Sequence, residues 1–457
     1  METTHAVLRG AASTSELLLE LVAANRAGRP LGLPSVCSAE RFVLEAALRR
    51  AARHRTVVLV ESTCNQVNQL GGYTGLRPAD FAALAAEVAG EAGYPLAGLI
   101  LGGDHLGPYP WRHDPAAAAM AKACDLVRAC VLAGYTKVHL DCSMRLADDP
   151  GVPGDGLSDE TAAARTARLV EAAEEARREL LADRPAPLYV IGTEVPTPGG
   201  EVGDGSGPSV TTAAQVERTW SLCAAAFAGN DRLRMALDRV VALVVQPGVE
   251  FGPDVVHDYH RTAGTRELSG AVERLPHLVY EAHSTDYQTR EALRELVEDH
   301  FAVLKVGPAL TFAAREALFA LAAIEDELRG GRTGGDRRDG PASRLRETLE
   351  RVMTAHPEHW RDYYAGDAAA RRLARSFAYS DRIRYYWAHP EVAAAVDRLM
   401  GALGERPIPP TLLGQYLPDQ ACAVRRGELP ARPSPRELVR HKVLTVLDDY
   451  AAACGTD

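Results

Sequence analysis

Eight short apolar runs, each followed by a longer helical pattern, constrain the fold of this chain more than any other feature. The runs are rich in β-branched residues and lie at 33–38, 56–63, 98–103, 137–142, 188–194, 240–246, 278–283 and 302–307. Alanine-rich helical patterns follow them, such as those at 78–93, 115–133, 158–182, 211–229 and 310–329. Continuous apolar runs of this length are typical of strands buried on both faces. Strands that alternate with helices form parallel βαβ units.

Eight such units within about 300 residues predict a (β/α)₈ TIM barrel. A doubly wound parallel sheet is the alternative, but no strand is followed by a G-x-G-x-x-G turn, and GDGSG at 203–207 has a different spacing. The missing turn also argues against a nicotinamide cofactor. We expect a barrel over 1–329, a mobile Gly- and charge-rich linker over 330–343, and a helical C-terminal extension over 344–457 that packs on the barrel.

Charge and cysteine spacing exclude several classes of function. The 51 basic and 61 acidic residues leave a net charge of −10, which argues against a nucleic-acid partner and against an anionic membrane surface. No apolar window is long enough to span a bilayer, and the N-terminus does not have the pattern of a signal peptide. The eight cysteines include no C-x-x-C pair. We therefore expect a cytoplasmic protein with free thiols.

Polar and ionisable residues gather at the C-terminal ends of the predicted strands, where the active sites of TIM barrels lie. The residues in question are Glu61, Asn65, Gln66, Asn68, Gln69, Asp104, His105, His139, Asp141, Ser143, Glu194, Glu201, Gln246, Glu250, Glu281, His283, Asp286 and Lys305. They follow seven of the eight strands or lie at their ends. Packing alone does not explain this concentration, so we expect one active site at this end of the barrel.

Histidines and carboxylates in this set predict a metal site. Asp104 and His105 follow an apolar strand and two glycines. Adjacent residues at a strand end point to different sides, so we expect one to hold a metal ion while the other transfers protons. Four further candidates lie at other strand ends: Glu194, Glu250, Glu281 and His283. A His/His/Glu or His/Glu/Glu set suits Zn²⁺, Mn²⁺ or Co²⁺ with positions left open for substrate, and Glu194 is either a ligand or the acid/base beside the metal.

Amide and basic groups predict the binding of a sugar or a sugar phosphate. Four amide side chains share one loop: Asn65, Gln66, Asn68 and Gln69. Neutral groups of this kind suit sugar hydroxyls, and the alternative is a polar turn in which the amides bond to their own backbone. Lys305 is expected to contact a phosphate or carbonyl oxygen, with a Schiff-base nucleophile as the alternative. Gly307 and the start of the next helix are expected to offer N–H groups to a phosphate.

An aromatic and basic segment of the C-terminal extension, SDRIRYYW at 380–387, allows two interpretations. In the first, it belongs to a helical cap that packs on the barrel. In the second, Arg382, Arg384 or Tyr385 reaches the mouth of the active site or a partner.

Nine segments together resemble one known family. They are ESTCNQVNQLGGYTG (61–75), LGGDHLGP (101–108), KVHLDCSM (137–144), IGTEVPTPGGE (191–201), VVQPGVEF (244–251), YEAHSTDYQTR (280–290), LKVGPALTFAAREALFAL (304–321), SDRIRYYW (380–387) and QYLP (415–418). Over about residues 20–445 the chain resembles the Z-type (GatZ/KbaZ-like) subunit family of class II D-tagatose-1,6-bisphosphate aldolase. That family is named for a subunit described as non-catalytic, which supports the aldolase polypeptide. It includes metal-dependent 4-epimerases that interconvert D-tagatose 6-phosphate and D-fructose 6-phosphate.

A more distant resemblance is to catalytic class II aldolases, whose barrels hold one zinc ion with three histidines. It implies that Asp104 is the acid/base aspartate and that His105 is the first metal ligand. Their second histidine corresponds to Glu250 here. The third corresponds to His283, with Glu281 as the competing candidate. The resemblance also likens Glu194 and Glu201 to a glutamate pair, and Lys137–Ser143 to a strand with the pattern I-D-x-S.

These observations predict a metal-dependent ketose or ketose-phosphate 4-epimerase that interconverts D-tagatose (6-phosphate) and D-fructose (6-phosphate) by retro-aldol and aldol steps. The expected catalytic residues are Asp104 and Glu194, and the expected metal ligands are His105, Glu250 and His283. The expected substrate-binding residues are Asn65, Gln66, Asn68, Gln69, Asp141, Ser143 and Lys305. A non-catalytic stabilising subunit of a class II aldolase, partnered by the catalytic subunit, is the alternative. A lysine-dependent aldolase acting through Lys305 is a third hypothesis, and a homo-oligomer is compatible with all three.

Overall fold

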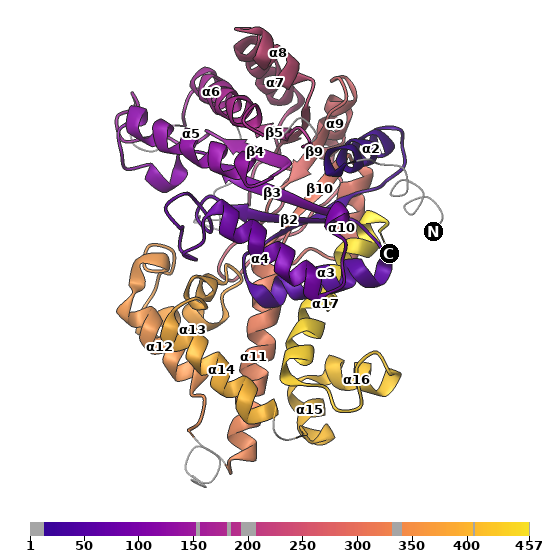
Figure 1. Ribbon diagram of the computed structural model, residues 1–457, viewed down its shortest axis with the longest axis vertical. Helices are drawn as coiled ribbons and strands as arrows, with labels where there is room; N and C mark the ends of the chain where they lie inside the picture. Colours follow the sequence, from indigo (N-terminus) through magenta and orange to yellow (C-terminus); the bar gives the residue numbers. More distant parts are fainter. Residues whose placement is uncertain are drawn as a thin grey trace.

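The computed structural model describes residues 13–151, 156–180, 184–192, 207–330, 341–404 and 407–456. Eight parallel strands close into a barrel in the order β1-β10-β9-β6-β5-β4-β3-β2, which confirms the predicted (β/α)₈ architecture (Figure 1). The barrel strands are β1 (Leu33–Cys37), β2 (Val58–Thr63), β3 (Leu99–Leu106), β4 (Lys137–Asp141), β5 (Leu188–Gly192), β6 (Val240–Val244), β9 (Val279–Ala282) and β10 (Phe301–Val306). A separate antiparallel hairpin pairs β7 (Glu250–Phe251) with β8 (Val256–His257).

Helices surround the strands and cover one end of the barrel. They are α2 (Thr14–Arg26), α3 (Arg41–His54), α4 (Pro78–Glu91), α5 (Ala116–Leu132), α6 (Asp159–Arg177), α7 (Ala213–Phe227), α8 (Asp231–Leu237), α9 (Ala263–Glu273), α10 (Arg290–Glu298) and α11 (Pro308–Leu328). The first of them places Leu18 and Val22 against apolar side chains of the barrel interior, such as Leu59 and Val303. Since burial of this apolar surface stabilises the contact, α2 covers the N-terminal end of the barrel and leaves the C-terminal end for a site.

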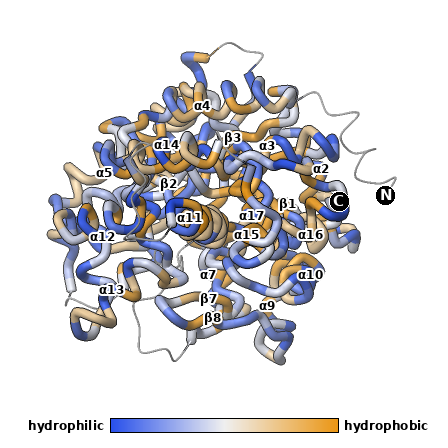
Figure 2. The backbone as a smooth tube through the Cα atoms, turned by 90° about the horizontal axis from the view of Figure 1, so that it is seen from below, coloured by the Kyte–Doolittle hydropathy of each residue, from blue (hydrophilic) through white to orange (hydrophobic). Residues whose placement is uncertain are grey.

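The C-terminal extension is built around α11, which continues well beyond the barrel (Figure 1). Its elements are α12 (Leu345–Ala355), α13 (Ala368–Phe377), the 3₁₀ turn η5 (Arg382–Tyr386), α14 (Pro390–Gly404), α15 (Pro410–Tyr416), α16 (Pro418–Arg426) and α17 (Pro435–Cys454). Seen from below in Figure 2, α11 stands near the centre, and α12, α14, α15 and α17 contact it. The last helix, α17, also packs against α3 and α10 of the barrel.

The strand boundaries agree with the sequence patterns to within a few residues, with one informative exception at β3. This strand continues to Leu106, beyond the expected end at 103. The extra residues include Asp104 and His105, so they belong to the sheet and do not lie in a loop after it. The predicted linker at 330–343 lies largely outside the described residues. Within the described part of the chain, no helix combines the length and the apolarity that a membrane crossing requires.

Candidate active site

A β-bulge at the end of β3 brings Asp104 and His105 to the same place. The pairing of β3 with β4 shifts register between Gly103 and Leu106, and His105 has a left-handed φ of 49°. A bulge turns the side chains of a strand away from strict alternation. The two side chains therefore do not point to different sides: both reach the cluster described next and offer it a potential ligand atom. The expected division of roles between metal binding and proton transfer stays a prediction.

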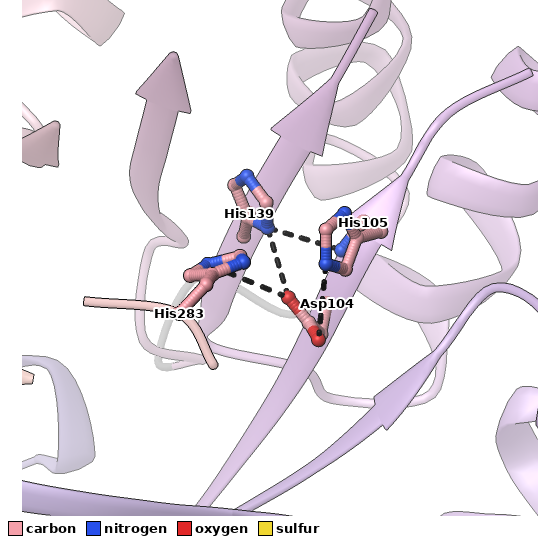
Figure 3. Close-up of side chains that lie close together, drawn as sticks. All are labelled: Asp104, His105, His139 and His283. Atoms are coloured by element: carbon pink, nitrogen blue, oxygen red, sulfur yellow. Dashed lines mark hydrogen bonds and ion pairs between the residues drawn. The ribbon is translucent and has the colours of Figure 1, made fainter. Parts of the chain in front are cut away.

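Four buried side chains form a cluster that could hold a metal ion, called the metal-binding cluster below: Asp104, His105, His139 and His283. One potential ligand atom of each lies within 4.8 Å of the others. The three imidazole rings surround the Asp104 carboxylate (Figure 3), with ring centroids between 4.8 and 5.1 Å apart. The residues come from the neighbouring strands β3 and β4 and from the segment after β9, which β5 and β6 separate from β4, so side chains from opposite sides of the closed barrel converge here.

Asp141 orients His105 within this cluster. Its Oδ2 lies 2.8 Å from His105 Nδ1, and its Oδ1 accepts hydrogen bonds from the backbone N–H and the hydroxyl of Ser143 at 3.0 and 2.6 Å. A carboxylate on one nitrogen of an imidazole fixes the tautomer and leaves the other nitrogen for a metal. Asp141 and Ser143 are predicted to bind substrate. The contacts of Asp141 are instead those of a side chain that orients a candidate metal ligand, His105.

His139 joins the cluster from a position that the sequence analysis noted but did not assign to the metal. Its Nδ1 lies 2.9 Å from Asp104 Oδ1 and 3.0 Å from the backbone nitrogen of His105. Its Nε2 is buried without a hydrogen-bond partner. Its place in the strand V-H-L-D was the signal, because the next polar residue of that strand, Asp141, was already a candidate.

A chain of buried ion pairs lies beside and below the metal-binding cluster. Lys137 Nζ lies 2.8 Å from Glu61 Oε1 and 2.6 Å from Glu281 Oε2, and none of the three side chains is exposed. Lys305 pairs with Glu61 and, at 3.0 Å, with Asp104 Oδ1. The other Glu281 oxygen lies 2.9 Å from His283 Nε2. Gly102 makes room for this network, since a Cβ there would collide with the Glu61 carboxylate.

Negative charge dominates the electrostatics of the site. Burial raises the pKa of Asp104, but His105 and Lys305 outweigh that effect and hold the pKa well below its usual range. Burial lowers the pKa of His105, but the carboxylates of Asp104 and Asp141 raise it above its usual value overall. Burial lowers the pKa of His139 to about 4, against its hydrogen bond with Asp104. Asp104 is therefore ionised at neutral pH, and His139 is neutral.

A cavity of about 90 Å³ opens onto the cluster at the C-terminal end of the barrel. Its polar lining includes Asp104, His105, His283, Lys305, Asn65 and Gln66. Two residues of the extension, Arg384 and Tyr385, complete the wall. The structure thus agrees with both interpretations of the C-terminal segment: the extension packs around the barrel helix α11, and part of η5 reaches the mouth of the site. Arg382 instead stacks on Tyr363, 3.0 Å from its ring centroid.

The four amides of the loop after β2 divide into two pairs. Asn65 and Gln66 line the cavity. Asn68 Nδ2 donates to the carbonyl oxygen of Cys64, and its Oδ1 accepts from the backbone N–H groups of Leu70 and Gly72. Gln69 Nε2 donates to the carbonyl oxygen of Lys122. The bonds of Asn68 match the alternative of a self-bonded polar turn, whereas Gln69 bonds to the backbone of α5. Neither residue is part of the cavity wall.

Three expected glutamates lie outside the metal-binding cluster or outside the described residues. Glu250 is buried on the β7–β8 hairpin, and its Oε1 accepts from the backbone N–H of Phe251. It is not a member of the cluster that contains His105 and His283, so its role as a ligand stays a prediction. Glu194 and Glu201 fall within 193–206, outside the described residues.

The start of α11 already holds a carboxylate. Asp286 Oδ1 accepts the backbone N–H groups of Gly307 and Ala309 at 3.0 and 2.7 Å. These N–H groups were expected to meet a phosphate, because the N-terminus of a helix attracts anions. Asp286 occupies that position in the described structure.

The comparisons with known proteins extend over nearly the whole chain. The family model of the D-tagatose-1,6-bisphosphate aldolase subunit GatZ/KbaZ-like matches residues 18–455. A crystal structure from Sinorhizobium meliloti 1021, described as a probable tagatose 6 phosphate kinase, is 46% identical with a TM-score of 0.81. The match covers 93% of this chain and 100% of that chain.

Two aldolase structures are more distantly similar. The YdjI aldolase from Escherichia coli K12 is 12% identical with a TM-score of 0.41, over 66% of this chain and 85% of that one. Fructose-bisphosphate aldolase from Campylobacter jejuni is 12% identical with a TM-score of 0.43, over 85% and 91% of the two chains. The extent of the family match and the 46% identity decide the relationship: the chain belongs to the D-tagatose-1,6-bisphosphate aldolase subunit GatZ/KbaZ-like family.

Proposed function

We propose that the chain is a metal-dependent 4-epimerase that interconverts D-tagatose (6-phosphate) and D-fructose (6-phosphate). The observation that carries this proposal is the ionised carboxylate of Asp104, which lies among three buried imidazoles at a cavity open to substrate. An ionised acid beside a potential metal site is the pairing that retro-aldol chemistry needs, since one group removes a hydroxyl proton and the other stabilises the charge left on the sugar.

The residues of the site fit a divalent metal ion. Imidazole nitrogens and carboxylate oxygens are good ligands for Zn²⁺, Mn²⁺ and Co²⁺, and Asp141 supports His105 as second-layer carboxylates do in metal sites. The buried network combines four carboxylates and two ammonium groups: Glu61, Asp104, Asp141, Glu281, Lys137 and Lys305. Histidines bind a metal in the neutral form, so in the metal-bound state two negative charges remain in this network, and one divalent cation would balance them.

We assign the metal to His105 and His283, with His139 as the third imidazole and Glu250 as the competing candidate. A divalent cation held by these residues would polarise the ketose carbonyl and stabilise the negative charge that develops beside it. Asp104 then accepts the proton of the 4-hydroxyl group. The C3–C4 bond breaks, C4 becomes an aldehyde carbon, and the bonding electrons move onto C3 next to the carbonyl.

Rotation of the aldehyde and re-formation of the bond on its opposite face invert C4, and Asp104 returns the proton. The ammonium group of Lys305, 3.0 Å from Asp104 Oδ1, holds this carboxylate in place. Direct deprotonation at C4 is excluded by chemistry, because that carbon is not adjacent to the carbonyl. Tyr73 and Tyr385, whose ring centroids lie 4.5 Å apart at the cavity wall, limit the access of water to the separated fragments.

Lys305 does not suit the role of a Schiff-base nucleophile. Burial lowers the pKa of Lys305, but the carboxylates of Asp104 and Glu61 outweigh it and raise the pKa well above its usual value. A lysine that forms a Schiff base must lose its proton first. The lysine-dependent aldolase is therefore the weakest of the three hypotheses.

A second candidate function is a non-catalytic subunit that stabilises a D-tagatose-1,6-bisphosphate aldolase. The description of the family as an aldolase subunit favours it. In that case the isolated chain is inert, and it raises the activity or the lifetime of a catalytic aldolase subunit.

The test uses the purified full chain alone. Fructose 6-phosphate and, separately, free fructose are incubated with Mn²⁺, Co²⁺ or Zn²⁺ or with excess EDTA, and the tagatose product is measured. We expect product that depends on the metal and is lost in His105→Ala and His283→Ala. His260→Ala is the matched control, because His260 is exposed and is not a member of the metal-binding cluster. No product under any metal would refute the epimerase and leave the subunit role to be tested with an aldolase partner.

A further inference from the structure

We infer that Arg384, from the C-terminal extension, binds an oxyanion at the end of the ketose remote from the metal, either a phosphate ester or a carboxylate. This inference rests on the proposed function for the identity of the sugar. It goes further in assigning the recognition of the substrate's charge to a residue outside the barrel.

Arg384 stands where two cavities meet. The cavity of about 90 Å³ contains the metal-binding cluster, and a neighbouring cavity of about 230 Å³ extends beneath the extension. The two share five lining residues: Cys37, Gln66, Tyr73, Gly307 and Arg384. The second cavity adds hydroxyl groups from Ser38, Thr74 and Thr311 and has no member of the metal-binding cluster. A substrate held at the metal thus has room for its far end beside the Arg384 guanidinium.

The guanidinium group of Arg384 has no carboxylate partner within 4.0 Å among the described residues. Its hydrogen bonds go to neutral acceptors: the carbonyl oxygens of Ser380 and Asp381 and the hydroxyl of Tyr385. Desolvation of a half-buried guanidinium costs free energy, and an anion that forms charge-assisted hydrogen bonds with it offsets that cost. The forked donors of a guanidinium match phosphate and carboxylate oxygens.

The acidic residues near Arg384 are engaged elsewhere. Asp381 is bound by Arg315 Nε at 3.0 Å and by the hydroxyl of Thr311 at 2.7 Å. Asp286 caps the start of α11, and Glu40 accepts from the backbone N–H of Val43 at the start of α3. The other arginine that lines the second cavity, Arg41, pairs with Glu45, Glu87 and Glu91. Because Asp286 also occupies the backbone N–H groups of α11, Arg384 is the cation among the described lining residues of the second cavity that has no carboxylate partner.

The surrounding structure holds the η5 segment in position before any ligand arrives. The buried Asp381–Arg315 pair ties the start of η5 to α11. Tyr385 stacks on His359 with an interplanar angle of 10° and a centroid distance of 4.8 Å, and it also packs against Tyr73. A preorganised donor binds with a smaller loss of conformational entropy.

The test measures binding by calorimetry in the full chain with Mn²⁺ present, and product formation in a separate assay. The probes are fructose 6-phosphate, fructuronate and fructose. We expect at least one anionic ketose to bind tenfold or more tightly than fructose. Arg384→Met should remove that preference, with a loss of at least tenfold for the anionic ketose and less than twofold for fructose. Arg384→Lys keeps the positive charge but loses the forked donors of the guanidinium, so its affinity for the anionic ketose should lie between those of the native chain and Arg384→Met. Arg346→Met, on the exposed face of the same extension, is the matched control and should bind as the native chain does.

The anionic ketose that binds more tightly than fructose shows whether Arg384 binds a phosphate or a carboxylate. The inference is overturned if fructose binds as tightly as both anionic probes, if no probe binds, or if Arg384→Met weakens all probes equally. Its failure is distinct from that of the epimerase. If Arg384 determines binding but no epimeric product forms, the subsite is supported and the epimerase activity is refuted. If charged and neutral ketoses turn over equally in the native chain and in Arg384→Met, the activity is supported and the subsite is refuted.

Discussion

The Nδ1 atom of His105 lies 2.8 Å from Oδ2 of Asp141 on the neighbouring strand β4, and both side chains are buried. This contact commits one imidazole nitrogen to a carboxylate and directs the other, Nε2, toward Asp104 (Figure 3). The tautomer of a metal-binding histidine is set in this way in many metal sites. The orientation of the candidate ligand is therefore built into the fold before a metal binds.

Weakening this contact should weaken metal binding. In Asp141→Asn the neutral amide still fits but loses the charge that favours the His105 imidazole, and we expect metal affinity to fall by about tenfold. Competition with a chromogenic chelator measures the change. Asp149→Asn is the control, because Asp149 lies in the loop after β4 and its carboxylate pairs with Arg165. An unchanged affinity in Asp141→Asn would remove Asp141 from the metal site.

The third metal ligand can be decided between His139 and Glu250. His139 lies in the metal-binding cluster and Glu250 does not, so we expect His139→Ala to lower metal affinity by at least tenfold and Glu250→Gln to change it by less than threefold. Metal content after dialysis, measured by elemental analysis, reports the difference. The opposite pattern would show that Glu250 takes the position of the second histidine, as the resemblance to class II aldolases implies.

Removing Lys137 should destabilise the barrel. Its ammonium group bridges Glu61 and Glu281 with no exposure to solvent, so Lys137→Met leaves two buried carboxylates without this partner. Breaking a buried ion pair from one side costs about 3–5 kcal/mol. The comparison is Lys122→Met, since Lys122 pairs with Asp114 at 2.7 Å but is 42% exposed, and such surface pairs contribute about 0–1 kcal/mol. Urea unfolding distinguishes the two, and equal effects would contradict the buried network.

Asp286 should make the chain less stable as pH rises. Burial raises the pKa of Asp286 from 3.8 to about 6, against its hydrogen bonds from Ala309 and Gly307. The folded state therefore holds this proton more tightly than the unfolded state, and the contribution is present below pH 3.8 and lost as pH rises through 6. Between pH 5 and 7.5 the loss is about 1 kcal/mol.

Asp286→Asn keeps an acceptor for the two N–H groups and has no proton to lose. We expect the unfolding free energy of this variant to fall by about 1 kcal/mol less than that of the native chain between pH 5 and 7.5. Asp254→Asn, at an exposed position, should show the native pH dependence. If Asp286→Asn and the native chain keep parallel profiles, the Asp286 carboxyl titrates with an ordinary pKa in the folded state.

Much of the fold was predictable because its signals are local. Each barrel strand is a continuous apolar run whose residues are buried on both faces, as β4, β5 and β6 show. The polar residues at the strand ends also predicted the correct end of the barrel, because parallel strands bring their C-terminal ends together. Asp104, His105 and His283 were thus assigned to one site before any distance was known.

Other parts of the site were not predictable, because they depend on register and on contacts between distant segments. The bulge that directs both Asp104 and His105 into the cluster is a feature of the pairing between β3 and β4, which the sequence does not show. The sequence does not distinguish Asn65 from Asn68 as a binding residue. In the structure the Asn68 amide bonds to the backbone of its own turn, and Asn65 lines the cavity.

The sequence by itself determined the eight-unit barrel, the end of the barrel that carries the chemistry, and the types of side chain available there, since periodicity and residue type are properties of the chain. Only the tertiary structure decided that His139 joins His105 and His283 around Asp104. It also decided that Asp286 caps α11 in place of an external anion, and that Arg384, 79 positions after Lys305, shares a cavity with it. The physical reason is that barrel closure and the packing of the extension around α11 bring these distant residues together. Neither can be recognised in the local pattern of residues.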